Sequence, residues 1–174
     1  MTPDVLKNGK ILVVDDDPMN IDVLRMILSD AGFANLSMLT DSRRAVSTFS
    51  NVDPDLVLLD LHMPHQDGYE VLQALHYLVP SDSFVPIIVL TADVTVNARR
   101  RALAAGATDF LSKPYDTVEM VLRVENALRL RFLHRDLQNE KATLERRVRD
   151  RTRSLERLVA ELRCASMPLF SAQL

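Results

Sequence analysis

The chain has 174 residues, of which 47% are hydrophobic and 26% are charged, and its formal net charge is −3. These values exclude a disordered chain and a strongly basic nucleic-acid-binding protein, and the length suits one domain of about 100 to 150 residues plus an appendage. The single cysteine, Cys164, cannot form an internal disulfide. Together with the lack of a signal-peptide pattern and of a run of about 18 apolar residues, this predicts a cytoplasmic protein without membrane contact.

Short apolar runs alternate with helical segments from the N-terminus onward. Most of these runs are apolar at consecutive positions, as expected for strands of a parallel sheet that helices cover on both faces. The five predicted strands are Ile11–Val14, Leu36–Leu39, Leu56–Leu59, Ile87–Leu90 and Ala107–Leu111. The alternation predicts an α/β fold with an open doubly wound sheet, because a barrel needs about 250 residues.

Capping residues mark the predicted helix ends. Asp17 before Pro18 predicts an N-cap with proline at the first helical position, and Gly32 predicts that this helix ends near residue 31. The other signals are Asp41 or Ser42 for the second helix, Asp67 for the third and Gly106 at the end of the fourth.

Reactive side chains follow four of the five predicted strands. Asp15 and Asp16 follow the first, Asp60 the third, Thr91 the fourth and Lys113 the fifth. The carboxyl ends of parallel strands meet at one edge of a sheet, so we expect these side chains to converge. Three neighbouring carboxylates repel one another and need a cation, and Mg²⁺ suits an all-oxygen site that also receives phosphate oxygens.

These residues stand within a larger set of motifs. The motifs are Val13-Val14-Asp15-Asp16, Asp60-Leu61-His62-Met63-Pro64, Asp67-Gly68, Thr91-Ala92 and Lys113-Pro114. In order and spacing they resemble the receiver domains of two-component response regulators. The resemblance covers residues 9–125 and implies a flavodoxin-like, five-stranded parallel sheet with strand order 2-1-3-4-5.

The resemblance implies a role for each residue at the sheet edge. Asp60 would accept a phosphoryl group from the phosphohistidine of a sensor histidine kinase or a phosphotransfer protein. Asp15, Asp16 and Asp60 would hold Mg²⁺ or Mn²⁺ together with the backbone carbonyl of His62. Lys113 and the Thr91 hydroxyl would hold phosphoryl oxygens. The chain would then be a regulatory phosphoacceptor rather than an enzyme acting on a separate substrate.

The resemblance also implies a conformational switch. Thr91 would move inward to bind the phosphoryl group and vacate space for the ring of Phe110, which has no hydroxyl and would therefore signal by packing. The Lys113–Pro114 bond is expected to be cis. His62 and Asp93 stand where the family tunes hydrolysis of the acyl phosphate, and we expect these polar side chains to permit moderate self-hydrolysis.

The C-terminal part predicts one long helix, over about residues 117–163, because 115–167 contains no glycine or proline and is rich in helix formers. A heptad frame places apolar residues at a and d, which is typical of a dimeric coiled coil over 126–164. The seam residues are Leu130, Leu137, Leu144, Val148, Leu155, Leu158 and Leu162. His134, Lys141 and Arg151 interrupt the frame. The alternative is a helix that folds back on its own domain.

The segment 144–152 is similar to connectors that precede cyclic-di-GMP phosphodiesterase or cyclase domains or kinase modules. No such output domain fits in the tail 165–174, so we interpret the chain as a fragment of a longer protein or as a stand-alone receiver with a dimer stalk. The arginines at 146–153 alternate with Glu145 and Asp150 and lack aromatic neighbours. This favours a solvated helix face over a nucleic-acid site.

Three other interpretations remain open. Asp15-x-Asp17 imitates the nucleophile motif of haloacid-dehalogenase phosphatases, although Met19 stands where that family expects Thr or Val. A pseudo-receiver that only dimerises and docks would not need the complete acidic, Thr and Lys set. His62 and His65 could suggest zinc, but no Cys or third His accompanies them.

Overall fold

The computed structural model describes residues 3–64, 67–93 and 95–165. Two compact units divide the chain at Arg135 and Asp136. The first unit contains the sheet and all helices up to the beginning of α6, and the described part of the second unit is the rest of that helix. His65 and all of the predicted tail except Ala165 lie outside the described residues.

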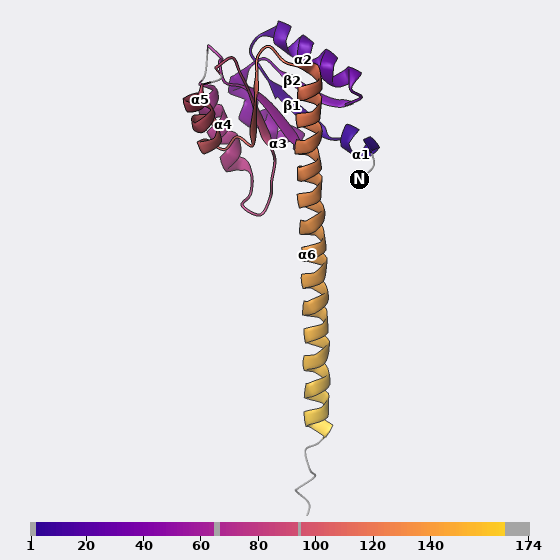
Figure 1. The fold of residues 1–174 in the computed structure, drawn as a ribbon. Helices are drawn as coiled ribbons and strands as arrows, with labels where there is room; N and C mark the ends of the chain where they lie inside the picture. Colours follow the sequence, from indigo (N-terminus) through magenta and orange to yellow (C-terminus); the bar gives the residue numbers. More distant parts are fainter. Residues whose placement is uncertain (1–2, 65–66, 94, 166–174) are drawn as a thin grey trace, which may run out of the picture. The chain divides into compact units, whose positions relative to one another are not determined.

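Five parallel strands form one sheet in the order β2-β1-β3-β4-β5, which confirms the predicted fold class. Figure 1 shows this sheet among the helices. The strands are β1 (Lys10–Val14), β2 (Asn35–Leu39), β3 (Leu56–Asp60), β4 (Ile87–Thr91) and β5 (Asp109–Ser112). The prediction for the fifth strand began too early, because Ala107 packs in a core cluster beside α5 instead of pairing with β4.

Helices precede, connect and follow the strands, and the predicted caps lie at their ends. They are α1 (Pro3–Lys7), α2 (Pro18–Asp30), the short 3-10 helix η1 (Ser42–Arg44), α3 (Ala45–Val52), α4 (Gly68–Leu78), α5 (Val96–Ala104) and α6 (Thr117–Ala165). The Asp17 carboxylate accepts a hydrogen bond from the Met19 N–H, and Asp67 caps α4 in the same way. Gly32 and Gly106 have φ angles of 90° and 107°, a left-handed conformation that favours glycine.

Side chains of the sheet alternate between two core clusters, one on each face. On β1, Ile11 and Val13 pack with residues of α1, α2 and α6, whereas Leu12 and Val14 pack with residues of α3, α4 and α5. Successive side chains of a strand point to opposite faces, so a strand covered on both sides must be apolar throughout. The helices thus hold the sheet rigidly and leave its carboxyl edge free to carry polar groups.

Helix α6 has a different environment in each unit. Within the first unit, Met120, Val124, Leu128 and Phe132 are buried in the core cluster on the α2 side of the sheet. In the second unit, the predicted seam residues are exposed, with Leu162 at 68%. Within the described ranges, no helix combines the length and apolar composition needed to cross a lipid bilayer.

Candidate functional site

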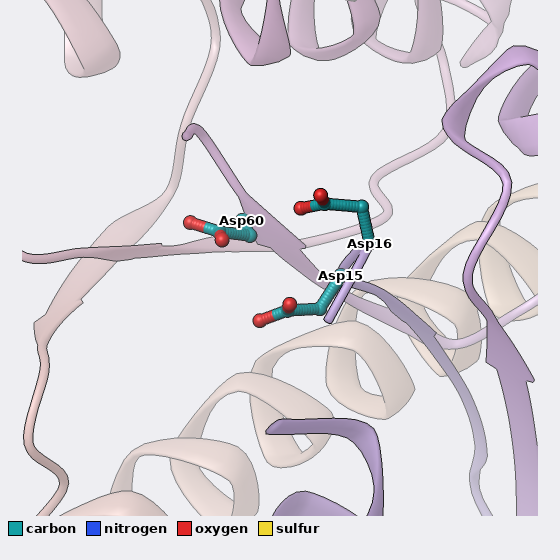
Figure 2. A group of neighbouring side chains, drawn as sticks. All are labelled: Asp15, Asp16 and Asp60. Carbon is teal, nitrogen blue, oxygen red and sulfur yellow. The ribbon is translucent and has the colours of Figure 1, made fainter. Parts of the chain in front are cut away.

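The three predicted acidic residues lie together at the carboxyl edge of the sheet. Asp15 and Asp16 follow β1 directly, and Asp60 is the last residue of β3. Because Val14 pairs with Leu59 in these neighbouring strands, the residues that follow share one edge. One carboxylate oxygen from each residue lies within 4.8 Å of the others, and Figure 2 shows the three carboxyl groups side by side. Asp15 and Asp60 are buried, and Asp16 is partly exposed.

Asp15 is held in place by three donors. Its Oδ1 accepts hydrogen bonds from the Asp17 N–H at 3.0 Å and from Asn20 Nδ2 at 3.1 Å, and its Oδ2 accepts one from Lys113 Nζ at 2.8 Å. Asn20 was not predicted as a site residue. Its position in the first turn of α2, five residues after Asp15, is the signal that could have identified it.

Lys113 joins the two buried carboxylates. Its amine also donates to Asp60 Oδ2 at 2.8 Å, and its backbone N–H donates to the Thr91 carbonyl. The Lys113–Pro114 bond is cis, as expected. Burial would lower the pKa of Lys113, but the hydrogen bonds to Asp15 and Asp60 raise it above its ordinary value. The amine therefore stays protonated.

The cluster keeps a surplus of negative charge. Three carboxylates face one amine within it. Burial raises the pKa of Asp16 first of all, and the neighbouring charges of Asp15 and Asp60 raise it further. Ionising Asp16 therefore costs free energy in the folded protein, and a bound divalent cation would offset that cost. An all-oxygen site with surplus negative charge fits a hard cation such as Mg²⁺.

The predicted accessory residues lie at or just after the carboxyl ends of β3 and β4. The His62 backbone N–H donates to Asp60 Oδ1 at 3.2 Å, while its side chain is exposed. The buried Thr91 hydroxyl accepts the Asp93 N–H at 3.0 Å. Asp93 in turn accepts the Thr95 N–H, and hydrogen bonds from Thr95 lower the pKa of Asp93.

Phe110 lies on β5, partly buried against the core cluster that α3, α4 and α5 share. The guanidinium of Arg99 lies 3.9 Å from the centre of its ring, a cation–π contact from α5. Arg99 could not have been identified from the sequence, since it is one of three consecutive arginines.

Gly68 has a steric role beside the site. A Cβ atom there would lie 2.4 Å from the Cα of Leu61, the residue that follows Asp60. The first turn of α4 can approach the Asp60 loop this closely only without a side chain. The Asp67-Gly68 motif is therefore explained by packing as well as by capping.

Comparison with known proteins agrees with the fold. The family model described as response regulator receiver domain matches residues 11–125. The DNA-binding response regulator MtrA of Mycolicibacterium smegmatis is 38% identical over 120 residues, which cover 69% of this chain and 50% of MtrA. The chain thus spans about half the length of this curated relative.

Solved structures give the same result. The Vibrio cholerae chemotaxis protein CheY4 is 28% identical with a TM-score of 0.61, and the match covers 67% of this chain and 98% of CheY4. A putative two-component response regulator/GGDEF domain protein is 25% identical with a TM-score of 0.66, and the match covers 72% of this chain and 51% of that one. The chain belongs to the family of response regulator receiver domains.

Proposed function

We propose that Asp60 accepts a phosphoryl group from the phosphohistidine of a sensor histidine kinase or phosphotransfer protein in a Mg²⁺-dependent reaction. The observation that carries this proposal is the buried Asp60 carboxylate, paired with Lys113 at 2.8 Å beside two more carboxylates. In the transfer, an Asp60 oxygen forms a bond to phosphorus while the P–N bond of the donor breaks. The electron pair of that bond returns to the imidazole nitrogen, which takes up a proton. The chain acts as a cytoplasmic regulatory phosphoacceptor.

The side chains around Asp60 would divide the work of positioning. Asp15, Asp16, Asp60 and the backbone carbonyl of His62 would hold Mg²⁺ (or Mn²⁺), which supplies positive charge against the phosphoryl oxygens. Lys113 already points at Asp60 and would neutralise one phosphoryl oxygen. Phosphoryl transfer needs little more than such positioning and charge neutralisation.

Signal transmission would begin at Thr91. We infer that Thr91 exchanges its hydrogen bond with the Asp93 N–H for one to the phosphoryl group, and that Phe110 follows it inward. This movement requires Phe110 to leave the guanidinium of Arg99. The polar side chains of His62 and Asp93 would permit moderate hydrolysis of the acyl phosphate.

The exposed seam of α6 would receive the signal by pairing with a second copy of the chain. Its apolar side chains, among them Leu144 and Val148, have the heptad spacing of a coiled coil and are exposed in the single chain. MtrA is described as DNA-binding, but this chain spans only half of it, and we infer no direct nucleic-acid contact by the present chain.

Acetyl phosphate with Mg²⁺ tests the phosphoacceptor. We expect intact-mass spectrometry to show one added phosphoryl group in the wild type and none in Asp60→Asn. Asp22→Asn, in an exposed ion pair of α2, is the matched control and should react like the wild type. Phosphorylation that persists in Asp60→Asn but disappears in Asp15→Asn would support the phosphatase interpretation, and no phosphorylation at all would support a pseudo-receiver.

Sedimentation of a seam variant tests the dimer. We expect Leu144→Lys to sediment as a monomer, because two lysines would face each other in the seam. Ala142→Lys changes an exposed position outside the seam and should leave the dimer intact. A monomeric wild type, or a dimeric Leu144→Lys variant, would contradict this part of the proposal.

A further inference from the structure

The hydroxyl of Tyr115 stands out among the described residues. It is the fully buried side-chain nitrogen or oxygen atom without a hydrogen-bond partner in that part of the chain. Leaving such a group unpaired is costly, since a buried hydroxyl has given up its bonds to water. The ring itself packs against the core cluster beside α2 and α6, a role that phenylalanine would fill without the penalty. The hydroxyl therefore calls for an explanation other than packing.

The hydroxyl lies within the electrostatic influence of Lys113, Asp15 and Asp60. Tyr115 lies two residues after Lys113, across the cis bond to Pro114. Burial raises the pKa of Tyr115, and the charges of Asp15 and Asp60 raise it further, whereas the charge of Lys113 and the approach of its amine to the phenol oxygen oppose this increase. The phenol is thus protonated at neutral pH and belongs to the electrostatic surroundings of the Lys113 amine.

The ammonium group of Lys113 has three N–H donors. Two of them go to Asp15 Oδ2 and Asp60 Oδ2. Formation of an acyl phosphate removes the negative charge of the Asp60 carboxylate and places new negative charge on the phosphoryl oxygens. When Lys113 exchanges Asp60 for a phosphoryl oxygen, the amine reorients, and its third N–H, which goes to neither Asp15 nor Asp60 in the free protein, can turn toward a new acceptor. A phenol oxygen can accept this hydrogen bond while keeping its own proton.

We propose that Tyr115 is a positioning residue whose hydroxyl oxygen accepts an N–H of Lys113 when the amine turns from Asp60 toward a phosphoryl oxygen. The inference rests on the proposed phosphoacceptor function. In the free protein the hydroxyl has no partner in good hydrogen-bond geometry, although the Lys113 amine is near it, and in the phosphorylated protein the hydroxyl holds the amine on the phosphoryl group. Tyr115 acts through Lys113 and touches no reacting atom.

Tyr115→Phe separates this role from packing. We expect the free variant to be as stable as the wild type or more stable, because the unpaired hydroxyl is gone. Phosphorylation by acetyl phosphate with Mg²⁺ should slow about three- to tenfold, the factor that one ordinary hydrogen bond represents. The rise in melting temperature caused by Mg²⁺ and beryllofluoride should shrink. Tyr77→Phe is the control, because Tyr77 is 84% exposed.

Tyrosine fluorescence gives an independent measurement, since the chain has three tyrosines and no tryptophan. In a Tyr69→Phe/Tyr77→Phe variant, Tyr115 is the sole emitter, and its emission should change when Mg²⁺ and beryllofluoride are added together. Unchanged emission, or a Tyr115→Phe variant that matches the wild type in phosphorylation rate, would overturn the inference. The inference would also be overturned if Tyr115→Phe lowered the melting temperature by the same amount with and without Mg²⁺ and beryllofluoride. A wild type that takes up no phosphoryl group would refute the phosphoacceptor function itself.

Discussion

The two ends of β3 each carry a buried aspartate, and the two are partnered in opposite ways. Asp55 directly precedes the strand and Asp60 ends it. At the Asp55 end, the carboxylate accepts the Lys10 N–H at 3.1 Å and ion-pairs with Arg131 at 3.5 Å and Arg135 at 3.4 Å. One acid faces two cations there, whereas three acids face one cation at the Asp60 end.

This difference distinguishes a structural cluster from a binding site. Arg131 is itself buried, and it also donates to the Phe84 carbonyl at 2.8 Å and to Ser83 Oγ at 3.1 Å. These hydrogen bonds replace the water that the buried guanidinium has lost. The Asp55 cluster fastens the first part of α6 to the sheet and is complete without a ligand. At the Asp60 end the acids outnumber the cation, and a divalent cation would supply the missing positive charge.

Removing the acid from the complete cluster should have the largest effect on stability. Asp55→Ala leaves the buried Arg131 without its carboxylate, and we expect a loss of about 3 kcal/mol in the free energy of unfolding. Urea denaturation measures this loss. Asp22→Ala removes an exposed ion pair of α2 and should cost at most about 1 kcal/mol. If Asp55→Ala cost no more than this control, the cluster would not be the fastening that we describe.

A side chain added at Gly68, beside the cluster of Asp15, Asp16 and Asp60, should lower the free energy of unfolding by an intermediate amount. The Cβ of Gly68→Ala would collide with the Leu61 backbone, and we expect a loss of about 1 to 3 kcal/mol together with slower phosphorylation of Asp60. Glu70→Ala, an exposed position in the same first turn, should change neither quantity strongly. Normal phosphorylation in Gly68→Ala would show that the Asp60 loop tolerates displacement of α4.

Removing one acid from the cluster of Asp15, Asp16 and Asp60 should stabilise the free protein slightly. Asp16→Asn removes a carboxylate whose pKa is raised by burial and by Asp15 and Asp60. At neutral pH and without Mg²⁺ we expect a gain of up to about 1 kcal/mol, since partial exposure screens the repulsion. The same variant should lose the stabilisation that Mg²⁺ gives to the wild type. A free Asp16→Asn protein less stable than the wild type would contradict the account of surplus charge.

The pH dependence of this gain follows from the sign of the pKa shift. The pKa of Asp16 is higher in the folded than in the unfolded chain, so the ionised group disfavours folding at neutral pH. That penalty disappears as the pH falls through the raised pKa. In thermal melts without Mg²⁺, the gap between Asp16→Asn and the wild type should therefore close on acidification. A gap that widened would mean that Asp16 stabilises the fold as an anion.

The two ends of β3 also differ in how far the sequence predicts them. Asp15, Asp16 and Asp60 follow apolar strands, and the rule that parallel strands end at one edge brings them together. The Asp55 cluster depends on Arg131, 76 residues away in sequence, and on the packing of α6. Local patterns contain no information about that packing. The Tyr115 hydroxyl was missed for the same reason, since only three-dimensional burial shows that it lacks a partner.

Chemical identification of the phosphorylated residue tests the central claim most directly. After acetyl phosphate and Mg²⁺ treatment, borohydride reduces an aspartyl phosphate to homoserine, which peptide sequencing by mass spectrometry then locates. The surplus of acid at the end of β3 predicts homoserine at position 60 alone, and none when EDTA removes Mg²⁺. Homoserine at position 15 or 55, or equal conversion at position 60 in the presence of EDTA, would contradict it.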